Sequence, residues 1–404
     1  MSKSSTKAVL LEVHSIAGLA LSLLLALVAL TGATMSFEDE IQAALNAGMT
    51  RVEARAEPKL MPGELIARVQ QTFGANKISS LTITGNTTSA VRIRFAPDER
   101  RVRPSSVYVD PYDARVIGTP VGEGFFITVR KLHRWLLIPG DAKGYGRPIT
   151  GIGAIGLILM LLSGLVLRWP RRARSIGAWL KPGFALRGRG LHRSLHAVFG
   201  TWVLLIYLVI ALTGLWYSFD WYRQGAVWLL SHPSSSTTAK AVRSPEPPEK
   251  SGGKFVISSS DLDRVWAAFL EKQTQGFAIA QMTLPTGSSK IVRIRSWPYD
   301  GSSGERDEFR VNAATAKIVS SELYAEKGFG DRILARVLDI HRGSILGWPG
   351  KLLFMLAALM MPLFVVTGLL LYLSRRRHKQ LSRVVRDDPI QIGRRENWAN
   401  DSKF

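Results

Sequence analysis

The sequence contains no cysteine. Its 404 residues therefore offer no disulfide, no cysteine-bound iron–sulfur cluster and no thiolate ligand for a metal. A Walker loop, a nucleophile motif and an acid–base constellation are absent as well, which argues against a hydrolase or a pump. Any redox chemistry has to use another ligand, and histidine is the obvious candidate.

Acidic residues are absent from four long apolar runs, at 15–37, 149–169, 197–219 and 351–373. Each run is long enough to cross a hydrocarbon core of about 30 Å, which takes about 20 helical residues. A signal peptide is the rival interpretation of the first run. That run is too long for a typical signal core, and no small-residue cleavage site follows it. The sequence therefore predicts four transmembrane helices, the first of them retained.

Basic residues gather in the short segments between these runs. Residues 168–193 hold eight Lys or Arg and no acidic residue, and residues 375–377 are all arginine. Short basic segments stay in the cytoplasm, so both termini are expected there and the two long loops outside. Because the net charge of +22 sits beside helix ends, it indicates topology and contact with anionic lipid, and no nucleic-acid partner is expected.

The chain repeats itself at an offset of 182 residues, the distance from His14 to His196. Each copy has the pattern His-x-x-x-Gly and then Leu-Thr-Gly. The outer loops repeat too: a helical stretch (62–73 or 259–272) precedes strand-like runs at 80–84 and 91–95 in the first loop and at 291–295 in the second. We expect a helical membrane protein with an internal two-fold repeat and two α+β domains outside.

The expected divisions follow the repeat. Each half has a membrane helix, an outer domain, an amphipathic segment and a second membrane helix. The ranges are 8–37 for helix one, 38–126 for the first outer domain, 127–169 for the first amphipathic segment and helix two, 170–192 for a basic cytoplasmic loop, 193–219 for helix three, 220–330 for the second outer domain with a Ser/Pro-rich linker at 231–253, 331–374 for the second amphipathic segment and helix four, and 375–404 for a cytoplasmic tail.

Four of the seven histidines occupy repeat-equivalent positions. His14 and His196 begin helices one and three at the cytoplasmic face, and His133 and His341 precede helices two and four at the outer face. A repeat can place equivalent imidazoles opposite each other, and six-coordinate haem iron needs such an axial pair. The simpler interpretation is that a duplication copied neutral interface residues. His192, His232 and His378 lack this pairing and are interpreted as solvated or inert.

Small residues lie at fixed distances from these histidines. One glycine follows each inner histidine by a helical turn, and a Thr-Gly or Ser-Gly pair ends each helix. We expect each haem to be ligated from one helix pair and packed on glycines of the other; the alternative is ordinary small-residue helix packing. The glycines are Gly18, Gly32, Gly164, Gly200, Gly214 and Gly368.

Two other groups of side chains suit a haem. Arg134 and Arg342 directly follow the outer histidines and are expected to pair with haem propionates, or else to be ordinary interface cations. Tyr207, Trp216 and Tyr217 in helix three are candidates to lie between the haems, although aromatic residues at helix ends more often form an interfacial belt.

Together these motifs resemble the PepSY-associated transmembrane-helix family over residues 8–378. The resemblance rests on the His-x-x-x-Gly starts, the Thr-Gly helix ends, the paired outer modules and the two outer His-Arg elements. It implies a bacterial inner-membrane protein with two periplasmic PepSY modules. Members are often linked to iron uptake, and some look like ferric-siderophore reductases with two b-type haems. The resemblance then makes the four paired histidines the iron ligands.

Transmembrane electron transfer is the leading functional hypothesis. An inner haem would accept electrons from a cytoplasmic or quinol donor, and an outer haem would pass them to a ferric siderophore in the periplasm, releasing Fe(II). One alternative is a non-enzymatic transport accessory for a siderophore or haem, which predicts a polar path or a broken helix; Pro362 is the candidate for a break. Another is a PepSY-type regulatory membrane protein.

Overall fold

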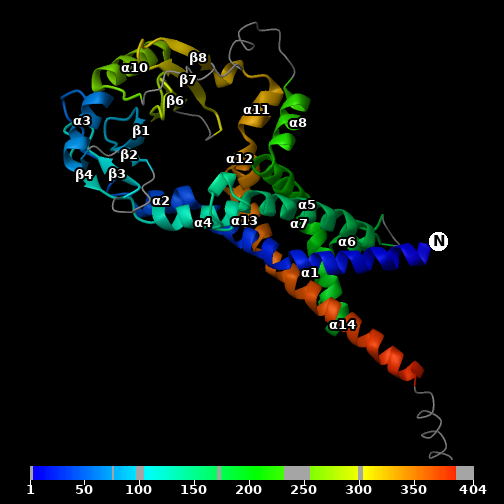
Figure 1. Cartoon of the computed structure of the whole chain (residues 1–404). Helices are drawn as coiled ribbons and strands as arrows, with labels where there is room; N and C mark the ends of the chain where they lie inside the picture. The colour runs from blue at the N-terminus through cyan, green and yellow to red at the C-terminus, as the bar shows by residue number, and fades with distance from the viewer. Residues whose placement is uncertain are drawn as a thin grey trace, which may run out of the picture. The chain divides into compact units, whose positions relative to one another are not determined.

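The computed structural model describes residues 3–74, 77–96, 104–170, 174–231, 255–298 and 304–387 (Figure 1). The expected linker at 231–253 and His232 lie outside these residues, apart from Ser231. In chain order the elements are α1 (Lys3–Met35), α2 (Glu38–Leu45), α3 (Pro62–Phe73), β1 (Ile78–Thr84), β2 (Val91–Phe95), β3 (Ser106–Val109), β4 (Val116–Gly118), α4 (Glu123–Trp135), η1 (Asp141–Lys143), α5 (Gly146–Arg168), α6 (Ile176–Leu180), α7 (Gly188–Ser218), α8 (Asp220–Leu230), α10 (Ser259–Lys272), β5 (Ile279–Thr283), β6 (Ile291–Trp297), β7 (Asp307–Asn312), β8 (Ile318–Glu322), η2 (Tyr324–Glu326), α11 (Phe329–Ala335), α12 (Val337–Arg342), η3 (Ser344–Leu346), α13 (Gly347–Leu359) and α14 (Met361–Asp387).

The chain divides into two compact units. A helical unit comprises Met1–Thr34, Leu132–Phe219 and Leu352–Phe404, and a sheet unit comprises Met35–Lys131 and Asp220–Lys351. The helical unit draws on both halves of the repeat, and so does the sheet unit, so neither half of the chain folds as a separate body.

Four segments of the described chain are long and apolar enough to span a membrane: Thr6–Met35, Gly146–Arg168, Gly188–Ser218 and Ser344–Gln380. This confirms the four transmembrane helices that the apolar runs predict. Within the helical unit α7 packs on both α5 and α14. A buried cluster of Val203, Tyr207, Ala357 and Met361 joins α7 to the fourth span.

The fourth span is interrupted at Met360, where α13 ends and α14 begins. The cause is Pro362, which has no N–H to donate and disfavours helical backbone in the residue before it. The phenol of Tyr207 donates a hydrogen bond of 2.7 Å to the carbonyl of Ala357 beside the interruption. A side chain of α7 thus adds a second hydrogen bond to a carbonyl that also accepts from the N–H of Met360 at 3.0 Å.

Close helix packing relies on glycines of α5. A Cβ placed on Gly151 would lie 2.6 Å from Cε2 of Phe219 and 2.8 Å from Cβ of Ser218, and one on Gly153 would lie 2.9 Å from Leu24 of α1. These glycines let helix backbones approach, as small residues do in membranes. Small-residue packing therefore occurs here mainly at positions other than the glycines singled out from the repeat.

The sheet unit contains a single antiparallel sheet with strand order β4-β3-β2-β1-β5-β6-β7-β8. Each half of the repeat contributes four strands, and β1 pairs with β5 at the centre, with Leu81 opposite Met282. The α+β character expected of the outer loops is confirmed, and the strands of the two loops form the two halves of one sheet. Pairing of β1 with β5 leaves neither half with an exposed inner edge, and unpaired edges invite aggregation.

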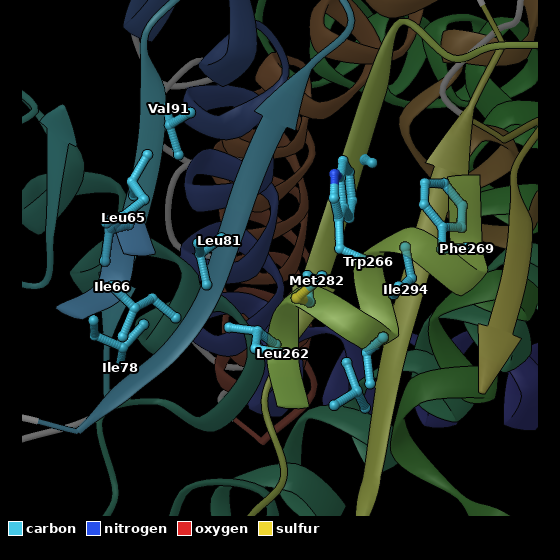
Figure 2. Close-up of a cluster of buried hydrophobic side chains, with 14 of the residues drawn as sticks. Leu65, Ile66, Ile78, Leu81, Val91, Leu262, Trp266, Phe269, Met282 and Ile294 are labelled. Carbon is cyan, nitrogen blue, oxygen red and sulfur yellow. The ribbon is translucent and has the colours of Figure 1, made fainter. Parts of the chain in front are cut away.

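The core of the sheet unit lies between the sheet and the repeat-related helices α3 and α10, which pack against each other. Alternate residues of the strands face this core, so Ile93, Val292 and Ile294 are fully buried. Figure 2 shows Leu65 of α3 and Trp266 of α10 in the same cluster as the strand residues Leu81 and Met282, which come from both halves. The fused sheet thus has one shared hydrophobic core.

Candidate functional site

The Ser-Gly pair near the end of α5 receives the side chain of His14 from α1. Nδ1 of His14 lies 2.7 Å from Oγ of Ser163. A Cβ placed on Gly164 would lie 3.5 Å from Cε1 of the same ring. The hydroxyl therefore fixes one ring nitrogen, and the glycine leaves room for the ring edge.

The second half of the repeat has the same arrangement at its equivalent residues. Nδ1 of His196 in α7 lies 2.9 Å from Oγ1 of Thr367 in α14. A Cβ on Gly368 would lie 3.6 Å from Cε1 of His196. Phe364, one turn earlier on α14, meets the imidazole edge-on at 5.5 Å between ring centroids. Both halves of the repeat thus have a histidine whose Nδ1 contacts a hydroxyl group and whose ring lies beside a glycine.

His133 in α4 is a third case. Its Nδ1 lies 3.1 Å from Oγ1 of Thr31 and 2.9 Å from the carbonyl oxygen of Val28, both on α1. A Cβ on Gly32 would lie 3.2 Å from Cε1 of His133, which is a tight contact. Burial lowers the pKa of His133 to about 4, so its imidazole is neutral at neutral pH.

The partners of Nδ1 determine which ring nitrogen carries the hydrogen. A carbonyl only accepts, so Nδ1 of His133 donates to Val28. The hydroxyls of Ser163 and Thr367 each donate their one hydrogen to a backbone carbonyl four residues earlier, at 2.6 Å, and so have lone pairs left for Nδ1. In all three histidines the lone pair is therefore on Nε2. Histidines that ligate metals commonly have this arrangement, with the other nitrogen donating to an oxygen.

The two inner histidines lie on repeat-related helices, His14 on α1 and His196 on α7. Within the described chain, no three His, Cys, Asp or Glu side chains gather as a site for a metal ion. The helical unit thus offers a pair of imidazoles from repeat-related helices, each held by a separate neighbouring helix.

The remaining residues expected at the site have the following surroundings. A Cβ on Gly18 would meet Sδ of Met160 at 3.4 Å, and one on Gly200 would meet Phe364 at 3.8 Å. Gly214 lies in α7, near its end. Three of the glycines thus border an imidazole ring and two border a side chain of another helix. Their contact with a macrocycle stays a prediction.

The two arginines that follow the outer histidines have partners within their own units. Arg134 lies over the rings of Trp135 and Tyr217, at 5.0 and 5.8 Å from their centroids. Arg342 donates to Asp39 at 2.9 Å. His341 precedes Arg342 at the end of α12. A role for either arginine with propionates, and the pairing of His341 with His133, stay predictions.

The hydroxyl residues are the part of the site that sequence reasoning missed. The Ser-Gly and Thr-Gly pairs were noted for their glycines, whereas Ser163, Thr367 and Thr31 hold the histidines. A signal was present, because a hydroxyl residue precedes the glycine in every copy, Thr213-Gly214 included. A residue type that recurs beside every candidate ligand suggests a hydrogen-bonding role.

Four membrane-spanning helices joined to an α+β sheet define an integral membrane protein. The chain belongs to the PepSY-associated TM region family, whose model matches residues 11–375. The expected family is therefore confirmed over nearly the whole chain. A comparison with curated proteins finds no match.

Proposed function

We propose that this protein carries electrons across the membrane through two b-type haems and reduces a ferric chelate, a siderophore complex, on the outer side. One observation carries the proposal: histidines from repeat-related helices are held through Nδ1 so that Nε2 keeps its lone pair. A haem held by these histidines would supply reversible one-electron transfer.

The residues suit two ligand levels. His14 and His196 would form the inner level, and His133, which Thr31 of α1 holds, would belong to the outer one. On α1, His14 and the Thr31 that holds His133 are 17 residues apart, or about 25 Å along the helix. This separation approaches the thickness of the hydrocarbon core, about 30 Å. The spacing therefore suits one acceptor near each face.

The space between these levels is apolar. Val203, Tyr207, Ala357 and Met361 are buried there, and the Tyr207 phenol is bonded to a carbonyl. Such packing excludes water and holds the dielectric constant low. The chain's part in the reaction is to orient the ligands, keep the path dry and bind the chelate. One electron converts Fe(III) to Fe(II), which hard oxygen ligands hold less tightly, so iron leaves the chelate.

Histidine variants test the proposal. We expect His14→Ala and His196→Ala each to abolish the inner haem's low-spin optical signature while the outer haem remains. His192→Ala is the matched control, because His192 lies one turn before His196 on α7 and has no hydrogen bond among the described residues. Equal haem content in His196→Ala and His192→Ala would contradict the assignment of His196 as a ligand of the inner haem.

A transport accessory for a siderophore or haem is the second candidate, and the interruption at Met360 favours it. Broken membrane helices often mark a substrate site. Here the break is bordered by the Tyr207 phenol and by apolar side chains of α7 such as Val203. Uptake of radiolabelled chelate by cells, with no reduction of its iron, is the result that would support transport.

A further inference from the structure

The two halves of the repeat share a Val-Arg-Ile-Arg motif that the haem proposal leaves without a role. It lies in β2 as residues 91–94 and in β6 as residues 292–295. The aliphatic members face the core under α3 and α10. Because strand residues alternate between faces, the four arginines stand on the opposite face of the sheet.

The strand register brings these arginines into two rows. Arg92, Thr82, Gln281 and Arg295 are successive cross-strand neighbours over β2, β1, β5 and β6. The row beside it runs Arg94, Ser80, Thr283 and Arg293. The ends of each row are three strand spacings apart, or about 14 Å. We call this surface the arginine strip: four arginines around an uncharged polar centre.

Cations outnumber anions around the strip. In the second half Arg293, Arg295, Arg306 and Arg310 surround Glu308, which bonds to Arg295 at 3.0 Å and lies 3.6 Å from Arg310. Arg293 is directly opposite Arg310 on the neighbouring strand, an unfavourable arrangement of like charges. In the first half Arg92 and Arg94 share Glu123.

Two of these guanidiniums have no partner of their own. Neither Arg293 nor Arg306 has a hydrogen bond or an ion pair among the residues that the structure describes. Burial and the neighbouring charge of Arg295 lower the pKa of both groups. The negative charge of Glu308 opposes this shift for both arginines, and that of Asp339 opposes it for Arg306. A crowded, partly buried arginine without a partner is costly unless an anion joins it.

We propose that the arginine strip, together with the neighbouring Arg306 and Arg310, binds a multiply anionic chelate with several oxygen donors. This rests on the proposed function and names its acceptor: a ferric complex of the catecholate or carboxylate class, in preference to a neutral hydroxamate. Arg94 and Arg310 expose 48 % and 44 % of their side chains, so solutes reach the strip. Arginine forks suit pairs of carboxylate or catecholate oxygens.

Binding of redox-inert gallium complexes to the full chain in detergent tests this inference. The probes are trianionic gallium tris-catecholate and neutral gallium tris-acetohydroxamate, measured by equilibrium dialysis at low and high salt. We expect the trianion to bind in a salt-sensitive way and the neutral complex not to bind. Arg293→Gln with Arg306→Gln should weaken binding about tenfold or more, and the corresponding lysine variants should weaken it less.

Arg264→Gln is the matched control, because Arg264 lies on α10 and pairs with Asp261 of the same helix. It should bind the trianion as the wild type does. Equal affinity for the neutral complex, or wild-type affinity in the double glutamine variant, would overturn the inference. Gallium binding involves no haem redox step, so His14→Ala should bind normally. If the protein bound the gallium trianion but contained no haem, only the proposed function would be refuted. If it contained haem but did not bind the trianion, only this inference would be refuted.

Discussion

A histidine is oriented to ligate a metal through Nε2 when a hydrogen bond to an oxygen holds its Nδ1. Nδ1 is held in His14, His196 and His133, and the oxygen that holds it comes from a different helix each time. Each imidazole is therefore oriented by packing between helices and not by its own helix alone. Loss of such a supporting partner commonly lowers metal affinity about 10–100-fold.

This supporting role gives a prediction for Thr367. Replacing it with the isosteric valine removes the hydroxyl that holds His196, so haem affinity at the inner pair should fall within that range. Thr367→Ser keeps the hydroxyl and should restore both affinity and the low-spin spectrum. Haem titration of the apoprotein, followed optically, measures both.

The control for this pair is Thr201→Val. Thr201 also lies in a membrane helix, and its hydroxyl bonds to the carbonyl of Ala197. It should leave haem affinity unchanged. If Thr367→Val bound haem with the wild-type spectrum and affinity, the hydroxyl would have no supporting role.

At this scale the sequence indicated the histidines but not what holds them. Repeat-equivalent spacing made His14 and His196 visible, because a fixed offset survives in one dimension. Ser163 is 149 residues from His14, and no local pattern reports a contact between distant helices. The repeat made the equivalence of the histidines visible in the sequence, whereas their hydrogen bonds required the fold, and their pairing as ligands stays a prediction.

Among the elements, α4 is anchored to the sheet by one carboxylate. Glu123 in its first turn accepts hydrogen bonds from Ser105 at 2.8 Å and Ser106 at 2.6 Å, and it lies 2.8 Å from Arg92. Burial alone would raise the pKa of Glu123. The serine hydrogen bonds and the charges of Arg92 and Arg94 outweigh burial and lower that pKa below its ordinary 4.5.

Glu123→Gln should therefore destabilise the sheet unit by about 1–3 kcal/mol at pH 7. A lowered folded-state pKa contributes stability above pH 4.5 that is lost as the pH falls through the folded value. The difference between wild type and variant should shrink in acid. Denaturant unfolding in detergent, followed by circular dichroism at several pH values, measures this.

Glu271→Gln on α10 serves as the control, since Glu271 is exposed. Equal unfolding free energies for wild type and Glu123→Gln at pH 7 would show that the carboxylate does not anchor α4.

Local sequence patterns predicted several elements correctly. The amphipathic stretches at 62–73 and 259–272 predicted α3 and α10 with their observed bounds. Proline chemistry indicated the interruption near Pro362. The strands β5 and β8 were not among the strand-like runs singled out, and β8 is a short edge strand whose residues are partly exposed. Its weak pattern follows from that exposure.

At the scale of the molecule, the two halves of the repeat are combined in both compact units. The helical unit takes helices from both, and the sheet unit pairs β1 with β5 between them. The sequence predicted two outer domains because each half carries its own helix and strands. Which edges pair is a long-range choice that periodicity does not encode, so the single sheet emerged only from the structure.

The absence of native cysteine allows a direct test of this pairing. Thr82 and Gln281 are opposite each other on β1 and β5, so Thr82→Cys with Gln281→Cys should form an intrachain disulfide on mild oxidation. Thr82→Cys with Arg295→Cys is the control, because β6 is two strand spacings, about 10 Å, from β1. Mobility on non-reducing gels distinguishes them, and equal cross-linking of both pairs would contradict the register.

The proposed function requires this membrane protein to hold two haems between repeat-related histidines. The most direct measurement is a reduced-minus-oxidised optical spectrum of the detergent-purified protein, together with a pyridine haemochrome count. We expect two b-type haems per chain with a six-coordinate, low-spin signature. A colourless protein from cells supplied with ample haem would contradict it.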